Sequence, residues 1–177
     1  QVLPDVPFVF EAEFDTKDNE RVNLKKEQFN LFVPTTYMLL EKTQQKINPS
    51  TDFPSIYKLL TNLIPVYRER KLYLNWLAGI LQTREKQLTA WVFRGEQGAG
   101  KGLMLEKILK PLFGQKQVIQ VEDQQLYSEF NPWLQNTMLV AFNEVACNTE
   151  SRNRVNSRLK ATITDSEIQI NEKHLRQ

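Results

Sequence analysis

The stretch that decides the fold is Trp91-Val92-Phe93-Arg94-Gly95-Glu96-Gln97-Gly98-Ala99-Gly100-Lys101-Gly102. It places four of the six glycines of the chain within eight residues, directly after a short apolar run and before a helical pattern. A backbone that wraps its N–H groups around phosphates needs positive φ angles and no Cβ in the way, and glycine meets both needs. The lysine near its end adds the matching positive charge. The stretch therefore predicts a phosphate-binding loop, formed by Gly95, Glu96, Gln97, Gly98, Ala99, Gly100, Lys101 and Gly102.

The elements predicted around this loop follow the order strand, loop, helix. Residues 88–93 have the length and the aromatic and β-branched character of a buried strand. Apolar residues then recur at helical spacing from Leu103 to Leu109, until Pro111 and Gly114 end the element. This order is the context in which a glycine cluster indicates a phosphate site rather than a surface turn with a chance lysine.

Two further strands are predicted downstream of the loop. Residues 118–121 form a short apolar run, and residues 137–142 form a longer one that ends directly before Asn143 and Glu144. An acid at the carboxyl end of an apolar strand is the expected companion of a phosphate loop. We therefore expect Glu144 to lie beside the loop, at the same edge of a parallel sheet flanked by helices.

The chain divides into three predicted parts. Residues 1–53 begin polar and acidic and are expected to form a partly irregular lead-in or linker. Residues 54–87 carry two amphipathic helical patterns, broken near Pro65, with a basic run at their junction that fits a solvated turn. Residues 88–177 form the core domain, which we expect to be truncated at its C-terminus. The chain, which does not begin with Met, is expected to be a piece of a longer protein.

The end of the chain is predicted to contain a basic helix and a hairpin. Residues 151–164 combine helical periodicity with several arginines and lysines. Residues 167–170 alternate like a strand and lead into a turn at 171–174. Basic side chains here suit a phosphate backbone, which positions a protein on nucleic acid without being read for sequence. Ordinary solvated surface charge explains them equally well, since the net charge of the whole chain is only +2.

Hydrolysis of a nucleoside triphosphate makes three demands on a protein. Charge on the β and γ phosphates must be neutralised, a divalent cation must lie between them, and a water must be oriented for in-line attack. The loop and Lys101 are predicted to bind the phosphates of a nucleoside triphosphate, and Glu144 to orient the water or hold the metal. Gly102 stands where this loop pattern carries a magnesium-binding Ser or Thr, so the metal has to be held otherwise or weakly.

Composition excludes several classes of protein. Cys147 is the sole cysteine and His174 the sole histidine, so one chain can build neither a disulfide framework nor a Cys/His zinc site. No run approaches the roughly 18 apolar residues of a membrane span. We expect a chain of the cytoplasm, with no membrane partner.

Several of these residues resemble the superfamily 3 helicases of viruses, phages and mobile elements, most closely the portion attached to phage primases and primase-polymerases. The matching pieces are Asn75 to Ala78, the glycine loop with its helix ending at Leu112-Phe113-Gly114, and Leu139-Val140-Ala141-Phe142-Asn143-Glu144. Residues 159–173 resemble the third motif of the family, a DNA-contacting hairpin, and residues 29–32 a segment that precedes the helical part.

The resemblance implies a P-loop NTPase fold of the modified AAA+ type, with an N-terminal helical collar. It implies a homo-oligomeric ring that moves along single-stranded or forked DNA at the expense of ATP and Mg²⁺. Lys101 and Glu144 match the two catalytic positions, and Lys160, Lys173 and His174 fall in the DNA-contacting region. The family's sensor asparagine and arginine finger are expected beyond Lys173, so this part alone is expected to hydrolyse ATP poorly or not at all.

The resemblance thus implies an ATP-dependent DNA helicase domain, fused to a primase or DNA polymerase in a phage or mobile-element replication protein. Two other functions remain open on the residues. Gly102 and the absent later motifs also suit a non-catalytic DNA-binding or oligomerisation module with a degenerate loop. A P-loop kinase-type transferase would carry a similar loop, together with a pocket for a small-molecule acceptor.

Overall fold

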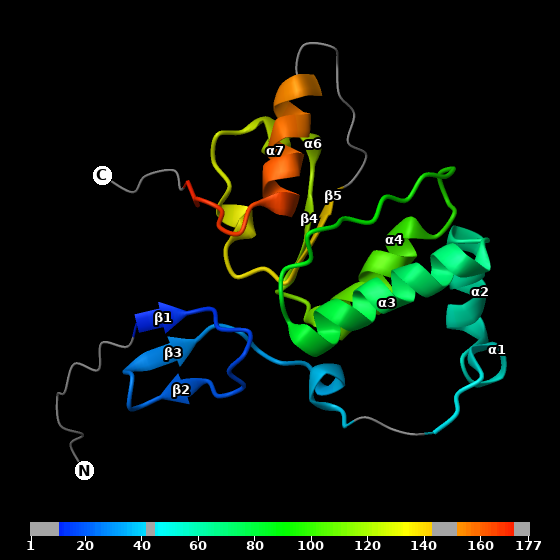
Figure 1. Ribbon diagram of the computed structural model, residues 1–177, viewed down its shortest axis with the longest axis horizontal. Coiled ribbons are helices and arrows are strands. Elements are labelled where there is room, and N and C mark those ends of the chain that lie inside the picture. The colour runs from blue at the N-terminus through cyan, green and yellow to red at the C-terminus, as the bar shows by residue number, and fades with distance from the viewer. Residues whose placement is uncertain (1–10, 42–44, 143–151, 172–177) are drawn as a thin grey trace.

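The computed structural model describes residues 11–41, 45–142 and 152–171 (Figure 1). Strands and helices both contribute, and the strands form two small separate sheets. Figure 1 shows one sheet at the N-terminal end, a group of helices at the other end, and the second sheet with two more helices between and above them. The glycine loop projects from the helical end.

The N-terminal part contains a three-stranded sheet that the sequence analysis missed. Its strands are β1 (Glu11–Glu13), β2 (Val22–Asn23) and β3 (Gln28–Asn30), in the order β1-β3-β2. The central strand β3 runs parallel to β1 and antiparallel to β2. Part of the expected irregular lead-in is therefore ordered by strand pairing between segments that are separated in sequence.

Asn30 holds the loop of this sheet together. Its side-chain oxygen accepts hydrogen bonds from the backbone N–H groups of Asp15 (3.0 Å) and Phe32 (2.9 Å). Its amide nitrogen donates to the carbonyl oxygens of Asp15 and Asp18, both at 2.9 Å. Phe32 is fully buried and meets Phe14 edge to face. A buried amide with all these partners stabilises one loop conformation, since any lost partner leaves a polar group unsatisfied.

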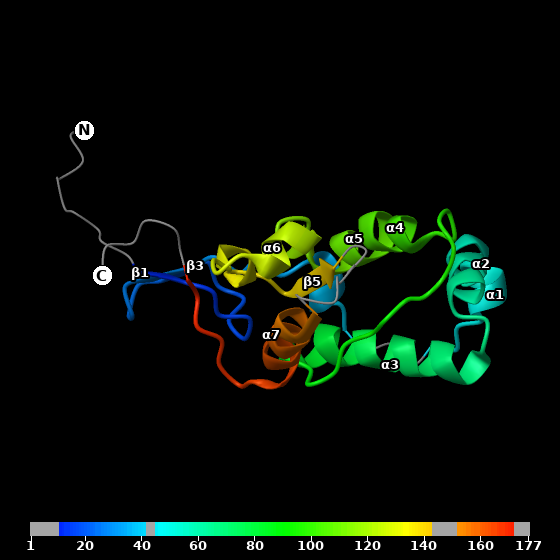
Figure 2. The ribbon, with the colours of Figure 1, turned by 90° about the horizontal axis from the view of Figure 1, so that it is seen from above.

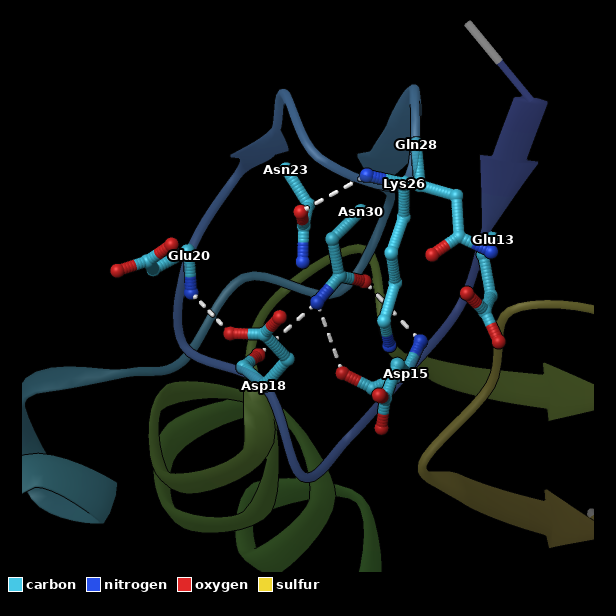
Figure 3. Close-up of a pocket in the computed structure, with 8 residues that line it drawn as sticks. All are labelled: Glu13, Asp15, Asp18, Glu20, Asn23, Lys26, Gln28 and Asn30. Atoms are coloured by element: carbon cyan, nitrogen blue, oxygen red, sulfur yellow. Dashed lines mark hydrogen bonds between the residues drawn. The ribbon is translucent and has the colours of Figure 1, made fainter.

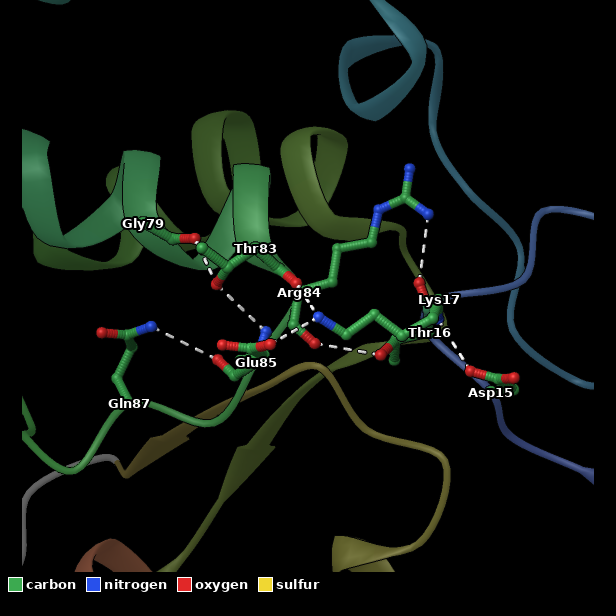
Figure 4. Close-up of polar contacts among 8 residues, drawn as sticks. All are labelled: Asp15, Thr16, Lys17, Gly79, Thr83, Arg84, Glu85 and Gln87. Carbon is green, nitrogen blue, oxygen red and sulfur yellow. Dashed lines mark hydrogen bonds and ion pairs between the residues drawn. The ribbon is translucent and has the colours of Figure 1, made fainter.

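This N-terminal sheet is attached to the C-terminal end of α3 (Tyr67–Thr83) by polar contacts (Figure 4). Arg84 ends that helix in a left-handed conformation, with φ of 53°. Its guanidinium donates to the carbonyl oxygen of Thr16 (3.1 Å), and the Thr16 hydroxyl donates back to the Arg84 carbonyl (3.0 Å). Lys17 pairs with Glu85 at 2.8 Å, and its hydrogen bond and charge lower the pKa of that carboxyl.

A second attachment runs through Gln117, which is buried. Its side-chain oxygen accepts from the N–H of Val33 (2.8 Å), while its amide nitrogen donates to the carbonyls of Val33 (3.0 Å) and Phe113 (2.7 Å). One side chain thereby joins the N-terminal part to the helix that follows the glycine loop. The sequence offered no signal for this role, because an isolated glutamine in a polar stretch fits solvated surface equally well.

We predict that Gln117→Ala lowers the free energy of unfolding by roughly 1–3 kcal/mol, since it leaves the buried Phe113 carbonyl without this partner and removes both bonds to Val33. Chemical denaturation measures this change. The matched control is Gln115→Ala, because Gln115 is exposed and should shift stability by less than about 0.5 kcal/mol. Equal midpoints for the two variants would show that Gln117 does not hold the two parts together.

The helical region agrees with the prediction of two helices between residues 54 and 82. The helices are α2 (Pro54–Leu63) and α3, preceded by one short turn, α1 (Pro49–Asp52), which was not predicted. The basic run was expected to be a solvated turn, but it lies in the first turns of α3. Within it Arg70 is buried and donates to the carbonyls of Ile64 (2.6 Å) and Pro65 (3.0 Å), so it satisfies the C-terminal end of α2.

The helix after the glycine loop runs continuously from Lys101 to Phe113. It consists of α4 (Lys101–Met104), one π-helical turn (Leu105–Leu109) and α5 (Lys110–Phe113). The π turn, in which the Lys110 N–H reaches the Leu105 carbonyl, directly precedes Pro111. Pro111 has no N–H to donate, and the wider turn lets the helix pass it. The predicted helix is confirmed: it passes Pro111 and ends at Phe113, with Gly114 as its C-cap.

The second sheet consists of β4 (Val118–Val121) and β5 (Leu139–Phe142), which run parallel with Val118 opposite Leu139. Both predicted strands are confirmed. The main core lies between α2, α3, the helix from Lys101 to Phe113 and β4, with the buried residues Leu60, Ile64, Tyr73, Leu77, Ile80, Met104, Leu105, Leu109, Phe113 and Val118.

Two helices cover the far side of this sheet. They are α6 (Asp123–Tyr127) and α7 (Arg152–Thr164), and they share a smaller core of Val121, Leu126 and Val155. A 3-10 turn (Pro132–Leu134) joins α6 to β5. In both views β5 lies between α7 and α4, so the two helices are on opposite sides of the sheet (Figures 1 and 2). The predicted helix at 151–164 is confirmed over 152–164.

Two predicted strands are not strands. Residues 167–170 pair with no described strand. The side chain of buried Asn131 holds this segment instead: it donates to the Gln169 carbonyl (2.9 Å) and accepts from the Asn171 N–H (2.6 Å). Residues 88–93 have no regular secondary structure and pair with no strand in the described part of the chain. Within that same part, no helix combines the length and apolar character that a membrane crossing requires.

Candidate functional site

The glycine loop folds back on itself through its own lysine. The Lys101 ammonium donates to the carbonyl oxygens of Gly95 (2.8 Å) and Glu96 (2.9 Å), at the other end of the loop. These two bonds close residues 95–101 into a ring. The ring places a positive charge at its rim and turns the carbonyls of Gly95 and Glu96 toward that charge.

Two glycines in the ring have backbone conformations that side chains disfavour. Gly98 has φ of +85° and Gly100 has φ of +103°. At Gly100 a Cβ would also come within 2.6 Å of Leu59 Cδ1, on helix α2. The backbone path therefore explains glycine at positions 98 and 100, as the sequence predicted, but not at 95 and 102, which lack positive φ.

Several N–H groups of the ring remain available to a ligand. The N–H groups of Gln97, Gly98 and Gly100 make no hydrogen bond to any described residue, and that of Ala99 makes one long bond of 3.4 Å to the Glu96 carbonyl. The thirteen-residue helical run begins directly afterwards at Lys101 and adds the unpaired N–H groups of its first turn. Successive backbone N–H groups at a helix N-terminus form an anion site, which the dipole of the helix favours.

The loop can therefore bind a phosphate chain by backbone donors and one ammonium. It is exposed over residues 94–98 and half-buried from Ala99 to Lys101, so a ligand has access from solvent. These donors suit an anion such as a phosphate. Gly102 has no side-chain oxygen, and among the residues that the structure describes, no three His, Cys, Asp or Glu side chains form a group that could hold a metal ion.

The other predicted site residues are placed only in part. Glu144, Lys173 and His174 lie outside the described residues, although β5 ends at Phe142, two residues before Glu144. Lys160 is exposed on α7. Because α7 and α4 lie on opposite sides of β5, the structure does not bring Lys160 together with the glycine loop (Figures 1 and 2).

Arg158, on the same helix, has a structural role. Its guanidinium donates to the carbonyl oxygens of Ser128 and Leu126 (3.3 Å), at the end of α6. These bonds tie α7 to α6 and occupy a side chain that the sequence analysis had grouped with the basic residues facing nucleic acid. Lys160, another basic residue of α7, is exposed.

The sequence analysis did not single out the acidic pocket of the N-terminal sheet (Figure 3). Its lining residues are Glu13, Asp15, Asp18, Glu20, Asn23, Lys26, Gln28 and Asn30. The space holds about one water molecule, at ≈ 10 Å³. Asp15, Asp18 and Asn23 accept hydrogen bonds from backbone N–H groups two residues on, which explains their position as turn formation.

A substitution at position 102 can test whether a side chain there would contact Mg²⁺. A Cβ at Gly102 would meet nothing within 4 Å, and its φ is not positive. We therefore predict that Gly102→Ser folds normally and strengthens the Mg²⁺ dependence of ATP binding several-fold, because the hydroxyl supplies a metal ligand. Titrations of ATP with and without Mg²⁺ measure this effect.

The matched control is Gly102→Ala, which adds the same Cβ without the oxygen. It should leave the Mg²⁺ dependence unchanged. If the serine and alanine variants respond to Mg²⁺ alike, the hydroxyl position of this loop does not face the metal.

Comparison with known proteins gives a family match and one close sequence relative. Residues 93–177 match the model of a family described as "Family of unknown function (DUF5906)". Over 151 residues, or 84% of this chain, the sequence is 40% identical to the DNA primase-polymerase of Nitratiruptor phage NrS-1. The matched part is 20% of that protein, so the chain spans about a fifth of this relative.

Solved structures give the same relative. An apo structure of the NrS-1 C-terminal region has a TM-score of 0.76 and 33% identity, over 94% of this chain and 39% of that one. An A-form apo structure of the region has a TM-score of 0.71 and 32% identity, over 94% of this chain and 38% of that one. The chain is therefore similar, in sequence and in structure, to a part of a phage DNA primase-polymerase.

Proposed function

We propose that this chain is the nucleotide-binding part of an ATP-dependent DNA helicase domain, similar to superfamily 3, in a phage or mobile-element replication protein that also carries a primase or polymerase. The observation that carries the proposal is the ring closed by Lys101 on the carbonyls of Gly95 and Glu96. The similarity to a phage primase-polymerase supports the setting in DNA replication.

In this proposal the glycine loop binds the phosphates, and Glu144 acts on the water and the metal. The N–H groups of residues 98–102 bind the β and γ phosphates of ATP, and Lys101 moves from its own loop carbonyls to the phosphate oxygens. Glu144 orients the attacking water and holds Mg²⁺, directly or through water. These groups act on charge that develops during phosphoryl transfer, where fixed donors are most effective.

DNA contact is assigned to a different part of the molecule. Lys160, which is exposed on α7, and the downstream Lys173 and His174 would contact the phosphate backbone of single-stranded or forked DNA. Several copies of the protein would assemble into a homo-oligomeric ring around one DNA strand. ATP hydrolysis at the glycine loop would then move these contacts along the DNA.

Gly102 favours a second candidate, a DNA-binding or oligomerisation module that does not hydrolyse ATP. A loop without the magnesium-binding hydroxyl can still bind phosphates through its backbone. Such a module would bind DNA in a salt-sensitive way that ignores ATP. The two candidates therefore differ in whether ATP changes what the protein does to DNA.

Strand displacement from a forked DNA by the full-length protein separates them. The helicase proposal predicts displacement that requires ATP and Mg²⁺ and that stops in the Lys101→Ala variant. DNA binding without displacement, unchanged by ATP, supports the non-catalytic module.

A further inference from the structure

The glycine loop lies against helix α2. In both views the chain that enters α4 passes beside this helix (Figures 1 and 2). A Cβ built on Gly100 would stand 2.6 Å from Leu59 Cδ1, so this methyl group of the leucine lies close against the Gly100 backbone. Apart from the two residues that flank Gly100, no other atom of the described chain comes within 4 Å of that Cβ position. One side chain of α2 therefore makes this contact with the loop.

The position of α2, and with it that of Leu59, is fixed by other contacts. Leu60 and Ile64 of this helix are buried in the main core. The carbonyl oxygens of Ile64 and Pro65, at its C-terminal end, accept hydrogen bonds from the Arg70 guanidinium of α3 at 2.6 Å and 3.0 Å. The Leu59 side chain is half-buried and packs against the same core. Leu59 therefore presents a fixed apolar surface to the glycine loop.

Gly100 is the point where the loop becomes a helix. It is the N-cap residue of α4, with φ of +103°, and its carbonyl oxygen accepts the hydrogen bond of the Met104 N–H (2.9 Å). Its own N–H makes no hydrogen bond to any described residue and is one of the donors open to a ligand. The conformation of Gly100 thus directs that donor and sets the start of the helix. A glycine backbone is free to adopt many conformations, so a neighbouring contact is needed to select one.

We propose that Leu59 is a positioning residue for phosphate binding. Its side chain holds Gly100 in the conformation in which the N–H groups of the loop converge on one ligand, and it touches no phosphate itself. A loop that is ordered before binding costs the ligand less to occupy. The helical region of residues 54–87 thereby takes part in nucleotide affinity, because movement of α2 away from the loop would release Gly100. The inference rests on the proposed function, in which the glycine loop is the phosphate site.

Substitutions of Leu59 in the full-length protein test this role. Leu59→Ala should lower the affinity for ATP roughly 10-fold, since the ligand must then order one or two backbone residues that the leucine ordered before. Leu59→Met keeps an apolar side chain of similar volume and should stay within about twofold of the wild-type affinity. Titrations with inorganic tripolyphosphate should show the same fall for Leu59→Ala, because the effect acts on the part of the site that binds phosphates. Circular dichroism of each sample verifies that the variant is folded.

The matched control is Leu63→Ala, one turn further along α2. Leu63 is half-buried and packs against the same core, but it makes no contact with the Cβ position of Gly100. It should lose a similar amount of stability and keep its ATP affinity within about twofold. Equal losses of affinity in Leu59→Ala and Leu63→Ala overturn the proposal, because the leucine would then act through general stability. A fall for ATP without a fall for tripolyphosphate also overturns it, because Leu59 would then act on the nucleoside.

Two further variants keep the test decisive. If Leu59→Ala does not fold, Leu59→Val removes Cδ1 with a smaller loss of core packing, and Leu63→Val is then its control. Lys101→Ala, titrated beside them, separates this inference from the proposed function. Loss of ATP binding in Lys101→Ala with wild-type affinity in Leu59→Ala overturns the positioning role alone. Unchanged affinity in Lys101→Ala overturns both, because the glycine loop would not be the phosphate site.

Discussion

ATP binding by the full-length protein is lost in the Lys101→Ala variant, with an expected fall in affinity of ~100-fold or more. The variant removes the two hydrogen bonds that close the ring on Gly95 and Glu96. It also removes the positive charge that meets the phosphates, and hydrogen bonds to charged groups contribute about 1.5–3 kcal/mol each. Both the shape of the loop and its charge complementarity therefore depend on one side chain.

Two variants make this measurement specific. Lys107→Ala removes an exposed lysine from the same helical run and should leave ATP affinity unchanged. Lys101→Arg keeps the charge but replaces a compact ammonium by a broader planar group, so we expect it to bind ATP poorly as well. Unchanged affinity of Lys101→Ala in a titration would remove the glycine loop from the ATP site.

The second large effect is expected at Glu144. Glu144→Gln should keep ATP binding near the wild-type value and lower the turnover rate by ~100-fold or more, because the amide cannot act as a base or as a charged metal ligand. The expectation rests on the sequence position of Glu144, two residues beyond the end of β5. Measurement of binding and of phosphate release on the same preparation separates the two effects.

Glu167→Gln is the matched control, since Glu167 is exposed and lies on a segment without strand pairing. It should leave both binding and turnover unchanged. Full turnover by Glu144→Gln would show that another residue orients the water, and a loss of binding would show that Glu144 belongs to the phosphate site itself.

The parts of the fold that were predicted from sequence share a local cause. The glycines at positions 98 and 100 follow from a backbone path with positive φ, which is a local property of the loop. The helices α2 and α3 and the strands β4 and β5 follow from apolar periodicity within single short segments. The acid after β5 follows from the same local pattern, but the structure does not describe it.

The parts that were missed depend on distant partners. The N-terminal sheet forms because β1 pairs with β3, although β2 lies between them in the sequence. Asn30 in turn accepts a hydrogen bond from the backbone N–H of Asp15, fifteen residues earlier. Arg70 and Arg158 were assigned to solvated or nucleic-acid-facing surface, yet both cap backbone carbonyls of neighbouring helices. A basic residue that ends as a cap has no local signature, because its acceptors come from another element.

The segment at residues 88–93 shows the opposite kind of error. Its composition predicted a buried strand before the loop, but Leu88 and Val92 are exposed and only Trp91 and Phe93 pack inward, on Tyr73. The predicted strand pairing is wrong for the part of the chain that the structure describes. Strand-like composition reflects the packing of apolar side chains, and Trp91 and Phe93 pack on Tyr73 without strand pairing in the described part of the chain.

The measurement that tests the account most directly is ATP hydrolysis by the full-length protein, with and without single-stranded DNA. The account predicts Mg²⁺-dependent hydrolysis that DNA stimulates several-fold, with both the basal and the stimulated rate lost in Lys101→Ala. Absence of ATP turnover in a protein that still binds DNA would contradict it. In that case the ring of residues 95–101 would be a phosphate-binding remnant and not the nucleotide site of a helicase.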